Sequence, residues 1–187
     1  MQKRVIAQSQ KKGLSTQDIL LVGVLLAAGA VLKFFVGSMF TIVKPNFVIA
    51  MYALAILLIR PKLYEALIIG LLAGAICQFF PGTPYINLVS EPVGALVMVL
   101  LMKLPLQFKR FSFAPVVGTF LSTLASGFTF IAMVYVVLYT GADVEPMPLH
   151  LFFAVIFGTA AINTVIVQLL YLPLNLALRR NNAGTAV

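Results

Sequence analysis

The sequence predicts an all-α membrane protein whose six transmembrane helices form one bundle. Of its 187 residues, 61% are hydrophobic and 10% are charged, whereas soluble domains average roughly 45–50% apolar and about 25% charged residues. The apolar residues fall into six segments separated by short loops, and the basic residues gather in alternate loops. Together these observations indicate helices that cross a bilayer repeatedly.

The predicted spans follow one another after a basic, polar stretch. A helix needs about 20 apolar residues to cross the hydrocarbon layer, with a range of roughly 17–25. The candidates cover residues 19–39, 46–59, 63–80, 91–104, 114–139 and 149–178. The second and fourth are short for a full span, which indicates that their polar beginnings lie in a protein-lined cavity or that loop residues complete the crossing.

The distribution of charge orients the bundle. With the amino terminus inside, eleven of the thirteen Lys and Arg residues fall on the inner side, and only Lys33 and Lys44 fall on the outer side. Cytoplasmic loops collect basic residues, so we expect both termini in the cytoplasm and a multi-pass protein of the cell membrane. The same rule accounts for the net charge of +8, and we therefore expect no nucleic-acid partner.

The sequence predicts a single membrane domain. Residues 1–18 form a cytoplasmic segment, residues 19–180 the six-helix domain and residues 181–187 a short tail. The first segment lacks an apolar stretch followed by a small-residue cleavage site, so it does not resemble a signal peptide. No flexible linker or internal repeat divides the domain, whereas many stand-alone secondary transporters consist of two related halves.

The residue patterns of enzymes are missing. No lysine is followed by Ser or Thr, so the phosphate-binding loop of many ATPases is absent. One histidine and one cysteine cannot build a metal site rich in these residues, and Cys77 cannot form an intrachain disulfide. We interpret His150, at the outer end of the sixth span, as an interfacial residue. The sequence thus predicts no catalytic residue, metal or cofactor.

Polar residues gather instead at the outer ends of the predicted spans. Such residues are costly at membrane depth and are therefore functional candidates. They predict an outward-open site for a small molecule, with its floor at mid-membrane, formed by Lys44, Asn46, Gln78, Tyr85, Asn87, Glu91 and Asn163. Aromatic rings crowd the same ends, either as an interfacial belt or as stacking surfaces for a planar ligand.

Each polar residue also has a purely structural interpretation. Lys33, at the end of the first span, is expected to snorkel to the outer headgroups, and Asn163 is as readily an interhelical hydrogen-bond partner. Gln78 can cap backbone groups before the PGTP turn. An ordinary helix start can explain Lys44, Asn46 and Glu91. The predicted site therefore depends on the convergence of these residues.

Small residues repeat at helical spacing in three spans and would let helices approach closely. In the third and fifth spans we expect this to serve packing within the bundle. In the first span the small face either packs inside the bundle or docks another membrane subunit. The three sets are Gly23, Ala27 and Ala30; Ala66, Gly70 and Gly74; and Gly118, Ser122 and Ser126.

Three stretches carry a family resemblance that covers about residues 18–180. They read KPNF at 44–47, FPGTPYINLVSEPVGAL at 80–96 and AAINTVIV at 160–167. In these stretches and in its general layout, the chain resembles the substrate-binding S-components of energy-coupling-factor transporters, and among them the tryptophan-transporter branch. It departs from that branch at Asn46, where Asp is expected, and at Glu91, where Lys can precede the proline.

The resemblance implies a division of labour between subunits. An S-component of a prokaryotic cell membrane captures its substrate from outside, associates with a transmembrane coupling subunit and two ATPase subunits, and topples in the bilayer to release the substrate inward. For tryptophan or a similar aromatic metabolite, Lys44 would pair with the carboxylate and Glu91 with the ammonium. Asn87 and Asn163 would supply amide hydrogen bonds. The docking face would consist of Gly23, Ala27 and Ala30.

Other functions fit parts of the same pattern. An S-component for a vitamin or vitamin precursor shares the general layout. A stand-alone secondary transporter or channel would need no partner ATPases. A structural or assembly membrane protein would use the polar residues only to join helices.

Overall fold

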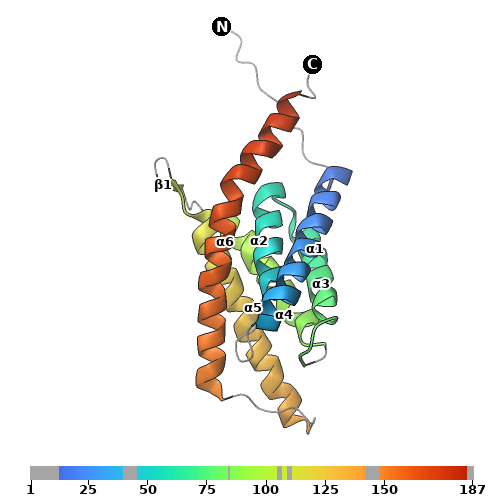
Figure 1. Cartoon of the computed structure of the whole chain (residues 1–187), viewed down its shortest axis with the longest axis vertical. Helices are drawn as coiled ribbons and strands as arrows, with labels where there is room; N and C mark the ends of the chain where they lie inside the picture. Colours follow the sequence, from blue (N-terminus) through green and yellow to red (C-terminus); the bar gives the residue numbers. More distant parts are fainter. Residues whose placement is uncertain are drawn as a thin grey trace.

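The computed structural model describes residues 13–39, 46–83, 85–104, 107–108, 111–141 and 148–184. Over these residues it contains six helices in one elongated bundle (Figure 1). They are α1 (Thr16–Met39), α2 (Phe47–Ile59), α3 (Leu63–Cys77), α4 (Asn87–Met102), α5 (Ala114–Tyr139) and α6 (Leu149–Gly184). Between α4 and α5 lie two antiparallel strands of two residues each, β1 (Gln107–Phe108) and β2 (Phe111–Ser112). Apart from this short pair, the regular structure of the described residues is helical, as predicted.

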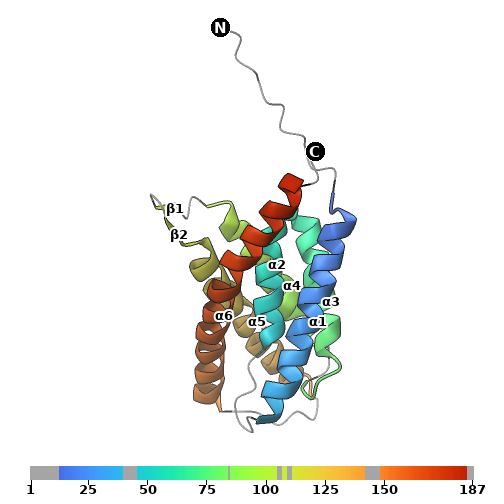
Figure 2. The ribbon, with the colours of Figure 1, turned by 45° about the horizontal axis from the view of Figure 1, so that its top comes forward.

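The short helix α2 forms the centre of the bundle. Its sequence FVIAMYALAILLI is apolar on every side, as expected of a helix that is buried all round. It contacts all five of the other helices, and Figures 1 and 2 show it enclosed by them. Arg60, in a left-handed conformation with φ of 50°, ends the helix, and its N–H donates to the Ile56 carbonyl. Central burial therefore accounts for the absence of polar residues from α2.

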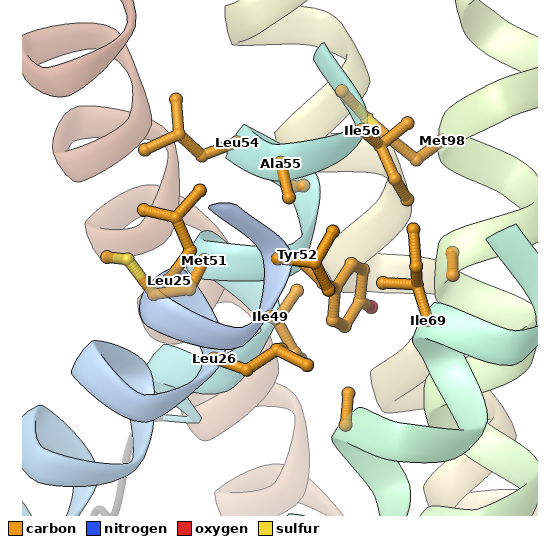
Figure 3. Packing of buried hydrophobic residues seen from close by; sticks show 14 of the residues in the cluster. Leu25, Leu26, Ile49, Met51, Tyr52, Leu54, Ala55, Ile56, Ile69 and Met98 are labelled. Atoms are coloured by element: carbon orange, nitrogen blue, oxygen red, sulfur yellow. The ribbon is translucent and has the colours of Figure 1, made fainter. Parts of the chain in front are cut away.

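Side chains from several helices pack around α2 (Figure 3). Leu25 and Leu26 approach from α1, and Ile69 approaches from α3. Between them the Tyr52 ring of α2 is completely buried. The core of the protein is thus the α2 helix together with the inner faces of its neighbours.

Small residues set the close contact between α3 and α4. A Cβ atom added at Gly70 would lie 2.5 Å from the Cα atom of Pro92, and one added at Gly74 would lie 2.5 Å from the carbonyl oxygen of Asn87. These distances leave no room for a side chain. Packing within the bundle, which was expected for the small face of the third span, is therefore confirmed, and the buried Gly118, Ser122 and Ser126 confirm it for the fifth.

Helix α4 begins four residues earlier than the sequence suggested. The prediction that Glu91 starts this helix is wrong, because the helix begins at Asn87 and carries both Glu91 and Pro92 in its second turn. Ile86, just before it, is buried and accepts hydrogen bonds from the N–H groups of Val89 and Ser90. The earlier start places Glu91 inside the helix, and its side chain is buried rather than at the rim.

Three of the helices contain stretches that are long and apolar enough to cross a membrane, namely Thr16–Val36, Ala114–Tyr139 and Leu149–Leu178. The other three, α2, α3 and α4, are apolar but shorter, at 13, 15 and 16 residues. Helix α1 begins and α6 ends at the same end of the bundle (Figures 1 and 2). This arrangement suits an even number of crossings; six full crossings and cytoplasmic termini stay predictions.

Candidate functional site

Three of the predicted site residues meet inside the bundle. Asn46 directly precedes α2, Glu91 lies on α4 and Asn163 lies on α6. The Asn46 side-chain Nδ2 donates to Glu91 Oε1. The Nδ2 of Asn163 donates to the backbone carbonyl of Asn46 at 3.2 Å. The convergence predicted from sequence is therefore present for these three residues.

Glu91 is held by uncharged donors in an interior position. It is 1% exposed, and besides Asn46 it accepts a hydrogen bond from Ser126 Oγ to Oε2 at 3.1 Å. The Tyr52 hydroxyl lies near this carboxylate without a hydrogen bond of standard geometry. Over the described part of the chain no cation lies within 4.0 Å of it. A buried carboxylate without an ion pair is costly, so Glu91 is a candidate for binding a cationic group.

Cys77 and Lys33 extend the cluster toward α1 and α3. The Lys33 Nζ donates to Cys77 Sγ at 3.3 Å and lies 5.0 Å from the centroid of the Phe80 ring. The same sulfur lies 3.7 Å from Asn46 Nδ2 and 4.0 Å from Glu91 Oε1. The expectation that Lys33 snorkels to the headgroups is wrong, because its half-buried ammonium points inward to Cys77.

Asn163 forms an interhelical hydrogen bond through its side-chain nitrogen, and its side-chain oxygen lacks a donor among the described residues. The residue is fully buried, and its Nδ2 also approaches Thr123 Oγ1 on α5 at 3.4 Å. This bonding confirms that Asn163 acts as an interhelical partner. Its Oδ1 has no hydrogen-bond partner among the described residues. A buried acceptor without a donor costs free energy, so a ligand donor at this oxygen would be stabilising.

The remaining predicted residues lie at the edge of the cluster or outside it. Gln78 donates through Nε2 to the Gly74 carbonyl at 3.0 Å and accepts from the Tyr85 N–H at 2.9 Å, which confirms its capping role. The Tyr85 ring is 72% exposed, and Asn87 is half-buried at the start of α4. Lys44 lies outside the described residues. Among the described residues, Gln78, Tyr85 and Asn87 thus have no hydrogen bond to Asn46, Glu91 or Asn163, and the full extent of the site stays a prediction.

The small face of α1 points away from the bundle. Gly23 and Ala27 are exposed, and a Cβ atom added at Gly23 would meet nothing within 4 Å. Ala30 is half-buried. The glycine that packs against α2 is instead Gly29, where an added Cβ would lie 3.0 Å from the Val48 Cα atom. The face defined by Gly23, Ala27 and Ala30 is thus largely free for contact with lipid or with another helix.

Several members of the cluster were missed from sequence. Ser126 was considered only as a small packing residue, and Cys77 only as a residue that cannot form an intrachain disulfide. Thr123 and Tyr52 gave no separate signal, because one hydroxyl in an apolar helix is common. Only their positions in space, Tyr52 beside Glu91 and Thr123 beside Asn163, distinguish them.

Comparison with known proteins agrees with these observations. The profile of the family described as "Tryptophan transporter TrpP" matches residues 15–179. The chain is also 26% identical over 172 residues to the "Probable tryptophan transport protein" of Bacillus subtilis (strain 168), an alignment that covers 90% of this chain and 96% of that relative. No solved structure matches. The match over nearly all described helices confirms the resemblance seen in the sequence, and the chain belongs to the tryptophan transporter TrpP family.

Proposed function

We propose that this protein is the substrate-binding membrane subunit of an ATP-driven uptake transporter of the energy-coupling-factor type, and that it captures tryptophan from outside the cell. Membership of the TrpP family supports tryptophan as the substrate. The sequence lacks the phosphate-binding loop, which suits a subunit whose partners hydrolyse ATP.

The buried carboxylate of Glu91 carries the proposal. An amino-acid ligand has an ammonium group, and a charge-assisted hydrogen bond to Glu91 would give this carboxylate the cationic partner that the described residues do not supply. Asn46 and Asn163 frame the same position, and the open Oδ1 of Asn163 suits an N–H donor of the ligand. Phe80, at the edge of the cluster, offers an aromatic surface for an indole ring.

The ligand carboxylate would require a cation from the outer ends of the helices. Lys44 is the candidate from the sequence pattern, and Lys33 is the candidate that lies within the described cluster. Gln78, Tyr85 and Asn87 would shape the rim, since they hold or flank the connection between α3 and α4.

The exposed face of α1 would contact the transmembrane coupling subunit. Small side chains let two helices pack closely in a bilayer, and Gly23 and Ala27 present such a surface outside the bundle. Two ATPase subunits would bind the coupling subunit on the cytoplasmic side and supply the energy for uptake.

Titration calorimetry on the purified protein in lipid nanodiscs tests the substrate. We expect L-tryptophan at micromolar concentrations to bind and to raise the thermal unfolding temperature. Binding of riboflavin or thiamine with no response to tryptophan would contradict the substrate and favour a vitamin S-component. Transport of tryptophan into vesicles that contain this chain alone would contradict the need for partner ATPases.

A further inference from the structure

A lysine with weak partners lies next to the buried carboxylate. The half-buried ammonium of Lys33 has two described contacts, the Cys77 sulfur at 3.3 Å and the face of the Phe80 ring at 5.0 Å. A thiol is a weak acceptor, and a lysine ammonium has three donors. Over the described residues no carboxylate lies within 4.0 Å of it. Lys33 therefore keeps most of its capacity to bind an anion.

Lys33 and Glu91 both lie beside Cys77 without forming an ion pair with each other. The Nζ and Oε1 atoms lie 3.3 and 4.0 Å from the same sulfur, so they are at most about 7.3 Å apart. The separation exceeds 4.0 Å, because no ion pair joins the two residues. A basic and an acidic side chain thus lie close to each other without a direct contact.

An α-amino acid matches such a pair of charges. Its carboxylate and ammonium are attached to the same carbon atom, and charge-assisted hydrogen bonds to each are about 2.7–2.9 Å long. A protein cation and anion that bind both groups must therefore lie several ångströms apart and must not touch each other. The separation between Lys33 Nζ and Glu91 Oε1 meets both conditions.

We propose that Lys33 binds the carboxylate of the amino-acid ligand and that it, rather than Lys44, determines the preference for a zwitterion over an amine. The inference rests on the proposed function, in which Glu91 binds the ligand ammonium. A zwitterion placed between Lys33 and Glu91 would give each side chain an oppositely charged partner, whereas a ligand without a carboxylate leaves Lys33 without an anionic partner.

The test compares two ligands that differ only in that carboxylate. L-tryptophanamide keeps the ammonium and the indole but carries a neutral amide. We expect wild-type protein in nanodiscs to bind L-tryptophan about 10- to 100-fold more tightly than the amide, as measured by titration calorimetry. The variant Lys33→Met should bind L-tryptophan only as tightly as the amide, with the affinity for the amide unchanged. Lys33→Arg, which keeps the charge, should retain part of the preference.

Two other lysines serve as comparisons. Lys103 is exposed at the opposite end of α4 from Glu91, so Lys103→Met should leave both affinities as in the wild type. Lys44→Met examines the alternative cation and should keep the preference for L-tryptophan. Loss of the preference in this variant together with its retention in Lys33→Met would overturn the proposal.

Three further results would also overturn it. Equal wild-type affinity for the two ligands excludes recognition of the carboxylate, and this result does not depend on the folding of any variant. A Lys33→Met variant with unchanged affinities, or one that weakens both equally, assigns Lys33 no role or a structural role. Wild-type protein that does not bind L-tryptophan at all refutes the proposed function, and the inference about Lys33 then falls with it; this outcome is recognised before any substitution is made.

Discussion

Replacement of Glu91 by glutamine separates the binding role of this residue from its structural role. Glu91→Gln keeps the shape of the side chain and removes its charge. The wild-type carboxylate is 1% exposed and is held by Asn46 and Ser126 without a cation among the described residues. An unpaired buried charge is destabilising, so the variant should be as stable as the wild type or more stable in the absence of ligand. Its affinity for L-tryptophan should fall, because a hydrogen bond between charged groups contributes about 1.5–3 kcal/mol, which corresponds to roughly a 10- to 150-fold change.

The two effects have opposite signs, and calorimetric titration and thermal unfolding measure them separately. Glu65→Gln is the matched control, because Glu65 is also a buried carboxylate, 5% exposed. It lies in the first turn of α3, at the opposite end of that helix from Cys77, and caps the helix by accepting from the Lys62 N–H at 2.7 Å. This control should lose some stability and keep the wild-type affinity. A Glu91→Gln variant that binds normally, or one that loses stability and affinity together, would refute the reasoning.

Three other predictions concern the rest of the bundle. Asn163→Ala should weaken L-tryptophan binding and lower the free energy of unfolding by about 1 kcal/mol through loss of an interhelical hydrogen bond; unchanged affinity in titration would contradict its place in the site. Gly70→Ala should lower the free energy of unfolding by about 1–3 kcal/mol, since the added methyl group collides with Pro92, whereas Gly23→Ala adds the same group in open space and should leave the unfolding temperature unchanged. Ala27→Leu should reduce tryptophan uptake by the complete transporter and co-purification of this chain with the coupling subunit, while the affinity of the isolated chain for L-tryptophan stays the same. Normal uptake would argue against a docking role for this face.

Much of the architecture could be predicted from local properties of the sequence. Apolar length and short polar loops indicated all six helices, and the bounds of α5 agree with the prediction. The start of α4 was placed too late, because the pair Glu91–Pro92 resembles a helix start and the burial of Ile86 has no local signature.

The candidate site was predicted only in part. Asn46, Glu91 and Asn163 were recognised because each is polar in an apolar setting, and they do meet. Lys33 was assigned to the headgroups, because a lysine at the end of a membrane helix commonly lies there. Its inward direction depends on Cys77 of α3, a residue 44 positions away in the chain.

The sequence by itself determined the class of the protein, its helices and its family, because hydrophobicity, helix length and motif spacing are properties of neighbouring residues. Only the tertiary structure decided which polar groups share the interior. Asn46 and Asn163 are 117 positions apart, yet they are joined by a hydrogen bond of 3.2 Å. Such a bond requires a particular distance and direction in space, and these arise from the packing of five helices around α2 rather than from any local pattern.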